Sequence, residues 1–183
     1  MPILSREIDL HPTGLLESDQ AVQSDWWAMY TLPRQEKKLM RKLLDQDVAF
    51  YAPILRRRHR SPNGRLRTSF QPLFGSYVFV CGDQSHRYQA VSTGCVSRWL
   101  PVTGVSELVF DLRQIKNLIA QDAPLSPESR LEPGQRVRIR NGSFAGYEGV
   151  IARRERETKL QVFVRFMDQG VSVLLDDCQA DPI

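Results

Sequence analysis

The sequence has few cysteines, and they are not spaced as metal ligands. It contains three, at Cys81, Cys95 and Cys178, an odd number without any Cys-x-x-Cys pair. This pattern disfavours a disulfide framework and a structural zinc site. Free thiols are typical of a reducing compartment, so we expect a cytoplasmic protein with no bound metal.

Long hydrophobic runs are also missing. No stretch approaches the roughly 18 uncharged apolar residues that a membrane-spanning helix needs. Acidic and basic residues from Arg6 to Asp19 stand where a secretory signal would have its apolar segment, so we expect no such signal. Hydrophobic residues make up 42% of the 183 residues and charged residues 25%, which excludes wholesale disorder. The composition predicts a soluble protein of one medium domain or two small ones.

The motifs of common enzyme classes are absent. The sequence has no phosphate-binding loop, no serine elbow, and no histidine and carboxylate paired at metal-ligand spacing. Its histidines, His11, His59 and His86, are isolated from one another in the chain. We therefore expect a protein without catalytic activity and without a cofactor.

Acidic residues are scarce in one segment, and this asymmetry is the main electrostatic signal. Residues 34–70 hold eleven bases and three acids, a net charge of +8, whereas residues 1–33 have a net charge of −4. The rest of the chain is balanced, and the whole chain carries +4. A polyanion is the natural partner of such a segment, although a solvated helix face accounts for part of the charge.

The pattern of residues 26–121 predicts an α+β domain. The run Arg56–Arg60, the pair Asn63-Gly64 and the run Arg65–Thr68 predict a basic β-hairpin, because Asn-Gly tolerates the positive φ of a tight turn. Strands and helices alternate around this hairpin, an order typical of a ferredoxin-like sandwich. We expect strands at 26–30, 48–51, 77–80 and 96–100, and helices at 34–46, 85–91 and 106–121.

The segments outside this domain follow a different pattern. Residues 1–25 mix Pro2, Pro12 and Gly14 with scattered acids, which predicts a flexible extension outside the fold. Two prolines in residues 122–132 stop the preceding helix and predict an extended linker. Residues 133–183 contain only short alternating strands at turn spacing, which predicts a small all-β barrel.

The start of this β-rich segment resembles a KOW motif. Three glycines, Gly142, Gly146 and Gly149, allow tight turns around Phe144, which we expect to plug the barrel. KOW motifs occur in NusG-type transcription factors and in some ribosomal proteins, and the resemblance implies an SH3-like β-barrel. A ribosome-associated RNA-binding protein is therefore the alternative interpretation.

The preceding domain distinguishes these two interpretations. Residues 26–30 (Trp-Trp-Ala-Met-Tyr) and 71–80 (Gln-Pro-Leu-Phe-Gly-Ser-Tyr-Val-Phe-Val) resemble the NusG N-terminal (NGN) domain. The order NGN, linker, KOW covers residues 26–183 and is similar to the NusG family. The domain lacks the longer insert of many housekeeping members, and in this respect the chain resembles the specialised RfaH-type paralogues. The pair Gly75-Ser76 departs from the proline and glycine or asparagine usual in the family.

The resemblance implies a transcription elongation factor that binds RNA polymerase and modulates pausing, termination or antitermination. In the family, an apolar depression of the NGN domain docks on the clamp helices of the largest polymerase subunit. The alternative for the aromatic residues is a place in the core, because strand neighbours face opposite sides. The implied lining residues are Tyr30, Phe74, Tyr77, Phe79 and Trp99, with Leu100 beside them.

Two further contacts are implied in the NGN domain. His86-Arg87-Tyr88 aligns with the short motif that RfaH-type factors place against the gate loop of the polymerase β subunit, although an ordinary helix start also fits. The basic hairpin implies contact with upstream or non-template DNA, since arginine binds phosphates and stacks on unpaired bases. A solubilising loop is the alternative. The hairpin residues concerned are Arg56, Arg57, Arg58, Arg60, Arg65 and Arg67.

The KOW domain of the family usually recruits Rho or the ribosomal protein NusE through one strand and loop. The corresponding residues here are Phe163, Phe166, Met167 and Asp168, and they depart from the Ile-Phe-Gly-Arg run of housekeeping members. Some RfaH-type KOW domains refold as a helical hairpin. Alternating β-branched residues predict a stable barrel here instead, in a monomeric protein.

Overall fold

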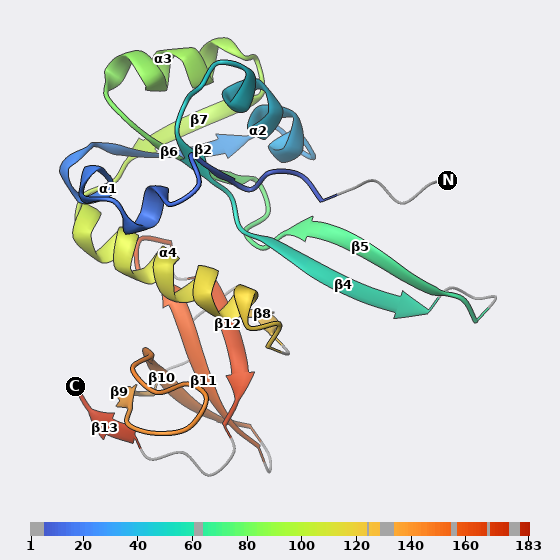
Figure 1. Ribbon diagram of the computed structural model, residues 1–183, viewed down its shortest axis with the longest axis vertical. Coiled ribbons are helices and arrows are strands. Elements are labelled where there is room, and N and C mark those ends of the chain that lie inside the picture. Colours follow the sequence, from blue (N-terminus) through green and yellow to red (C-terminus); the bar gives the residue numbers. More distant parts are fainter. Residues whose placement is uncertain are drawn as a thin grey trace. The chain divides into compact units, whose positions relative to one another are not determined.

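The computed structural model describes residues 6–60, 64–123, 125–128, 134–154, 157–167, 169–175 and 180–183. The chain is a mixed α/β protein that forms two compact units, residues 1–105 and 106–183 (Figure 1). No helix within the described ranges is long and apolar enough to cross a membrane. The long helix α4 (Val105–Ala120) is grouped with the second unit, whereas the sequence-based boundary follows residue 121 and stays a prediction.

A five-stranded antiparallel sheet forms the centre of the first unit. Its order is β1-β3-β6-β2-β7, so β2 and β6 occupy inner positions and β7 lies at an edge. The inner strands are buried at nearly every residue, which is typical of a sheet covered on both faces. The strands are β1 (Leu10–His11), β2 (Trp26–Thr31), β3 (Phe50–Tyr51), β6 (Tyr77–Cys81) and β7 (Val96–Pro101).

Helices α2 (Glu36–Asp45) and α3 (Gln84–Ser92) lie on one side of this sheet (Figure 1). The spacing of Leu39, Met40 and Leu43 places all three in the core, whereas Arg41 between them is exposed. The predictions of both helices and of the four strands around them are confirmed within a few residues.

Residues 6–25 are folded, in contrast to the predicted extension outside the fold. They contain β1, a 3₁₀ helix η1 (Leu15–Glu17) and the short helix α1 (Asp19–Gln23). Leu15 and Leu16 are almost completely buried, and the Trp26 indole donates a hydrogen bond of 2.7 Å to the Ala21 carbonyl. The two buried leucines and the Trp26 contact attach this segment to the core, which its acids and prolines did not indicate in the sequence.

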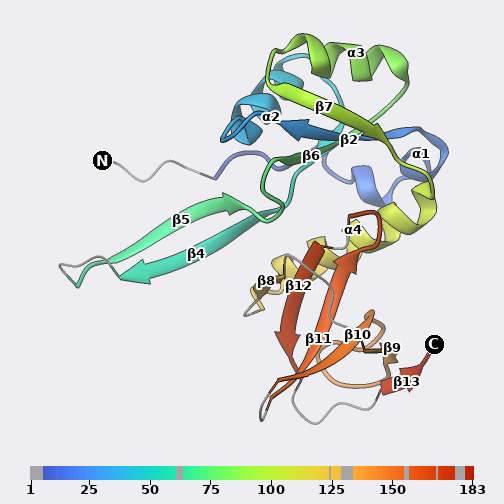
Figure 2. The same cartoon turned by 180° about the vertical axis from the view of Figure 1, so that it is seen from behind.

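The predicted hairpin is confirmed as a separate two-stranded sheet. Strands β4 (Ile54–Arg60) and β5 (Leu66–Pro72) pair in register from Ile54 opposite Pro72 to Arg60 opposite Leu66. Figures 1 and 2 both show this ribbon extending away from the five-stranded sheet. Asn63 lies outside the described residues, and Gly64 has a φ of 74°, which suits its place in the turn.

The second unit combines helix α4 (Val105–Ala120) with a six-stranded antiparallel sheet of order β13-β9-β10-β11-β12-β8. Burial alternates along β9, as the period-two pattern predicts, whereas β12 is buried at four consecutive residues, Gly170 to Val173. Strand β8 falls in the predicted linker and pairs with β12. The strands are β8 (Ser126–Glu128), β9 (Gln135–Ile139), β10 (Glu148–Arg154), β11 (Glu157–Val164), β12 (Gln169–Leu174) and β13 (Ala180–Pro182).

Tyr147, rather than Phe144, is the buried aromatic residue before β10. Phe144 lies in a turn and is half-buried, whereas Tyr147 is 8% exposed, and their ring centroids are 6.2 Å apart. The expectation that Phe144 plugs the sheet is therefore wrong. Gly149 and Gly170 are required for another reason, since a side chain at either position would collide with a backbone carbonyl of β11.

The burial of two titratable groups, Cys81 and Tyr51, predicts how the stability of the first unit depends on pH. Burial raises the pKa of the Cys81 thiol from about 9 to about 11 and raises the pKa of the Tyr51 hydroxyl further still. Above pH 9 the unfolded chain therefore releases protons that the folded chain retains. We expect the free energy of unfolding to fall progressively above pH 9, starting from its full value at neutral pH.

Urea unfolding, followed by tryptophan fluorescence at pH 7 and at about pH 10.5, checks this expectation. Substituting Cys81→Val removes one of the two protons and should make the decline shallower. A stability that is constant or increases over this range would contradict the assigned burial of both groups.

Candidate functional site

One face of the five-stranded sheet carries a cluster of two tyrosines and an arginine. Tyr30 of β2 lies directly opposite Tyr77 of β6, and their ring centroids are 5.2 Å apart at an angle of 76°. On the other side of Tyr30, the Arg98 guanidinium of β7 lies 4.6 Å from the ring centre. Both tyrosines are partly exposed and Arg98 is exposed. We call these three residues the tyrosine cluster.

The turn before β6 fixes the position of Tyr77. Ser76 has a φ of 65°, a left-handed conformation that a side chain rarely adopts. Its amide donates a hydrogen bond of 2.7 Å to the Glu36 carboxylate, and its carbonyl accepts one of 2.8 Å from the Thr31 amide. Although the pair Gly75-Ser76 differs from the residues usual in the family, hydrogen bonds therefore fix this turn to both α2 and β2.

Phe74 and Phe79 are core residues. They are 2% and 0% exposed, and their ring centroids lie 6.1 Å apart in an edge-to-face arrangement. Phe79 shares the face of Tyr77, as the alternation along β6 requires. The sequence resemblance grouped Phe74 and Phe79 with Tyr30 and Tyr77. In the structure, only the two tyrosines of this group are accessible.

Trp99 lies on the opposite face of the sheet. Its ring centroid is 5.4 Å from that of Trp27, and the Arg87 guanidinium of α3 lies 4.2 Å from the centre of the Trp99 ring. Trp99 is 39% exposed, so one part of this stack reaches the surface. Leu100, the next residue of the edge strand, is opposite Ala28 and faces the tyrosine side. Trp99 is therefore not brought together with Tyr30 and Tyr77.

The three consecutive residues at the start of α3 have three different environments. His86 belongs to the helix cap, where Asp83 accepts hydrogen bonds from the Ser85 and His86 backbone amides. Hydrogen bonds from Ser85 and then from His86 hold the pKa of the Asp83 carboxyl well below its usual range. Arg87 stacks on tryptophan, and Tyr88 is 69% exposed, so Tyr88 is the member of the motif most available to a partner.

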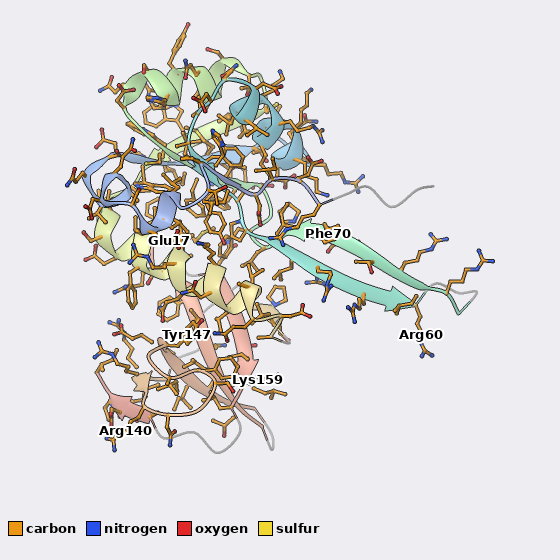
Figure 3. The ribbon with its side chains drawn as sticks, in the orientation of Figure 1. Glu17, Arg60, Phe70, Arg140, Tyr147 and Lys159 are labelled. Carbon is orange, nitrogen blue, oxygen red and sulfur yellow. The ribbon has the colours of Figure 1, made fainter. Side chains whose placement is uncertain are left out.

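The basic hairpin presents arginines on both of its faces. Arg56, Arg58 and Arg60 alternate along β4 and share one face, whereas Arg57 lies on the other face. Figure 3 shows Phe70 near the root of the ribbon and Arg60 near its far end. All six predicted arginines are exposed: Arg56, Arg57, Arg58, Arg60, Arg65 and Arg67.

The predicted partner site of the second unit surrounds the turn between β11 and β12. Phe163 is half-buried opposite Gly170, and Phe166 and Met167 are half-buried in the turn itself. Asp168 lies outside the described residues. The three described members are thus close in sequence and partly accessible.

A buried carboxylate of α4 holds this turn. Asp111 is 3% exposed and accepts hydrogen bonds from the Arg165 amide, at 3.0 Å, and from its guanidinium, at 2.8 Å. The hydrogen bond to Asp111 raises the pKa of Arg165. Gln114, on the same helix, accepts a hydrogen bond of 2.7 Å from the Glu148 amide of β10. Polar side chains of α4 therefore connect the helix to the turn after β11 and to β10, both in its own unit.

Sequence reasoning missed three residues of these sites: Arg98, Trp27 and Asp111. The register between β2 and β7 places Arg98 beside Tyr30, and this register is not visible in the sequence. Asp111 lies in an otherwise apolar stretch of α4, where a single acid is a weak signal that it is buried. Within the described part of the chain, no group of three or more His, Cys, Asp or Glu side chains could hold a metal ion.

Comparison with known proteins assigns the family. The model described as "Transcription termination factor nusG" matches residues 24–119, and the KOW motif matches residues 133–165. The chain therefore belongs to the NusG family, whose members are non-enzymatic transcription elongation factors. A chain in a crystal structure of the MjSpt4:Spt5 complex (conformation B) is 15% identical, and the match covers 86% of this chain and 97% of that one with a TM-score of 0.28. No curated protein sequence matches the chain.

Proposed function

We propose that the protein is an elongation factor that binds RNA polymerase and modulates pausing, termination or antitermination. Membership of the NusG family, with the KOW motif following the NGN domain, supports this role. In this proposal the first unit is a ferredoxin-like sandwich, the KOW segment is an SH3-like barrel, and the protein is a specialised, RfaH-type, cytoplasmic monomer.

The tyrosine cluster is the observation that carries the proposal. Two partly exposed tyrosines in edge-to-face contact offer a large, preorganised aromatic surface at a small entropic cost. Arg98 adds a cation beside them. Such a surface suits the clamp helices of the largest polymerase subunit, because tyrosine and arginine dominate the centres of protein interfaces.

In the proposal, the other exposed features bind other partners. The hairpin arginines bind nucleic acid near the transcription bubble, and Tyr88 contacts the gate loop of the polymerase β subunit. Phe163, Phe166 and Met167 contribute to a KOW site for NusE or Rho. Contacts on both sides of the polymerase cleft would hold the clamp closed, which suppresses pausing without any chemical step.

Binding of the full chain to a clamp-helix fragment of RNA polymerase tests the proposal. Each buried interface tyrosine is worth about 1–2 kcal/mol, so the double substitution Tyr30→Ala/Tyr77→Ala should weaken binding by at least about tenfold. Tyr88→Ala is the matched control, because it removes an exposed tyrosine outside the cluster and should leave binding to this fragment unchanged.

Circular dichroism must show that all the variants are folded. Equal binding by the wild type and the folded double variant would exclude the tyrosine cluster as the docking surface. Failure of the wild type to bind, combined with tight binding to ribosomal RNA, would favour the alternative of a ribosome-associated KOW protein.

A further inference from the structure

Strand β8 covers one edge of the six-stranded sheet in the second unit. It is the last strand of the sheet and lies beside β12, as Figures 1 and 2 both show. Ser126 and Pro127 are exposed, so these two residues are held by backbone pairing rather than by burial of their side chains. The register places Ser126 opposite Ser172, Pro127 opposite Val171 and Glu128 opposite Gly170.

The hydrogen-bonding pattern of β12 shows which of its backbone groups face this edge. The Leu175 amide donates a hydrogen bond of 3.0 Å to the Thr158 carbonyl of β11, and the two strands pair without a break from there. Backbone groups of alternate residues point to opposite sides of a strand. Those of Gly170, Ser172 and Leu174 therefore point away from β11, and β8 lies opposite the first two of these residues.

The position of Pro127 agrees with this pattern. Val171 directs its backbone groups toward β11, so the residue opposite it in β8 directs its own away from β12. Proline has no amide hydrogen, so at this position it removes no bond to β12 and leaves the outer side of β8 without a donor. The residues on either side of Pro127 occupy the positions that bond to β12.

The opposite edge of the same sheet has a similar arrangement. It ends in β13, which also has three residues and also contains a proline, Pro182. The Ile183 amide donates a hydrogen bond of 3.1 Å to the Arg136 carbonyl of β9, so the backbone groups of Pro182 point away from β9. A short strand with an outward-facing proline thus ends the sheet at both edges, and such strands prevent pairing with further chains.

The strand that β8 covers is suited to pair with a copy of itself. Strand β12 contains neither a charged residue nor a proline. In an antiparallel pair centred on Ser172, this residue would meet its own counterpart, and Gly170 would meet Leu174 of the second copy. Val171 would then lie opposite Val173, and β-branched residues favour such strands. This ladder has three hydrogen-bonded pairs, compared with two between β12 and β8.

We propose that β8 keeps the chain monomeric by occupying the outer edge of β12, which would otherwise pair with β12 of a second copy. Pairing within the chain prevails because the chain itself holds β8 close to β12, at an effective concentration that a second copy does not reach. Detachment of β8 leaves the outward-facing groups of Gly170 and Ser172 to bond with water or with another strand. This inference is independent of the polymerase contacts proposed above.

Moving the proline by one residue tests the inference. The double substitution Ser126→Pro/Pro127→Ser keeps the composition of the chain and replaces the amide that faces Ser172 with a proline ring, so β8 should detach. Pro127→Ser alone is the matched control, because it leaves both hydrogen-bonded pairs of β8 intact. Leu174→Pro, added to the double variant, removes an outward amide of β12 that lies beyond β8 and should therefore prevent pairing with a second copy.

Amide hydrogen exchange and light scattering coupled to size-exclusion chromatography, both with the full chain, give the measurements. In dilute solution the Gly170 and Ser172 amides of the double variant should exchange at least about tenfold faster than in the wild type, because they lose their acceptors in β8. In concentrated solution their protection should return and the molecular mass should double. The wild type and Pro127→Ser should stay monomeric throughout, and Leu174→Pro should return the double variant to the monomer.

Three results would each overturn the inference. Unchanged protection of Gly170 and Ser172 in the double variant would show that β8 does not cover the edge. Fast exchange in a double variant that stays monomeric at every concentration would exclude a second copy as the occupant and would favour an extended segment of another protein. Association that persists with Leu174→Pro would place the contact elsewhere on the chain.

Circular dichroism checks the fold of each variant. If a proline at position 126 unfolds the second unit, replacing residues 126–128 by glycine weakens β8 without introducing a proline ring. The same measurements and the same three contradicting results then apply to the glycine variant.

Discussion

Substituting Phe79→Ala should lower the free energy of unfolding of the first unit by about 3–5 kcal/mol. Phe79 is completely buried in the inner strand β6, between Ala28 of β2 and Tyr51 of β3, and its ring meets Phe74 edge to face. The substitution removes a large apolar side chain and leaves a cavity that an inner strand cannot close. Urea unfolding followed by tryptophan fluorescence reports this unit alone, because all three tryptophans belong to it.

Tyr77→Ala is the control for this prediction. Tyr77 occupies the same face of the same strand two residues earlier, but it is partly exposed, so its loss should cost less than half as much stability. The order of the two effects should reverse for binding to the clamp-helix fragment, when it is measured under conditions that keep both variants folded. A folded Phe79→Ala variant that loses stability no more than Tyr77→Ala would contradict the assignment of Phe79 to the core.

Individual helices and the hairpin could be predicted from the sequence because the patterns that specify them lie within short stretches of the chain. The spacing of Leu39, Met40 and Leu43 specifies one apolar helix face, and α2 follows it. The hairpin follows from two extended runs around a turn that contains Gly64. Helix α2 begins at Glu36, two residues later than the predicted start at residue 34, because Arg34 has a φ of 61°, which is not helical.

The set of residues that forms the candidate site was harder to predict from the sequence, because it depends on pairing between distant strands. Adjacent residues of β7 point to opposite faces, so Arg98 joins the tyrosines and Trp99 joins the stack with Arg87. An aromatic residue in the sequence does not show which face it occupies until the register is known. The group of five aromatic residues therefore divides into two accessible tyrosines, two core phenylalanines and one tryptophan on the other face.

Asp111→Ala should destabilise the second unit by about 3 kcal/mol. The carboxylate is buried and accepts hydrogen bonds from both the backbone and the side chain of Arg165, and its removal leaves a half-buried amide and a half-buried guanidinium without their acceptor. A hydrogen bond to a charged group contributes about 1.5–3 kcal/mol, and the unpaired amide adds its own desolvation cost. Differential scanning calorimetry gives the stability, and amide hydrogen exchange at Arg165 shows whether the turn after β11 opens.

Glu107→Ala separates this specific contact from a change in charge. Glu107 lies one turn earlier on α4 and is exposed, so its loss changes the net charge equally and should cost less than about 0.5 kcal/mol. Asp111→Asn keeps one acceptor oxygen for the Arg165 amide and should give an intermediate loss. Because Phe166 and Met167 lie in the turn that Asp111 holds and Phe163 lies just before it, faster exchange at Arg165 in Asp111→Ala should accompany weaker binding of any partner at this site. Equal stability of the Asp111→Ala and Glu107→Ala variants would show that the buried contact does not stabilise the unit, and the turn would then owe its conformation to the pairing of β11 with β12 alone.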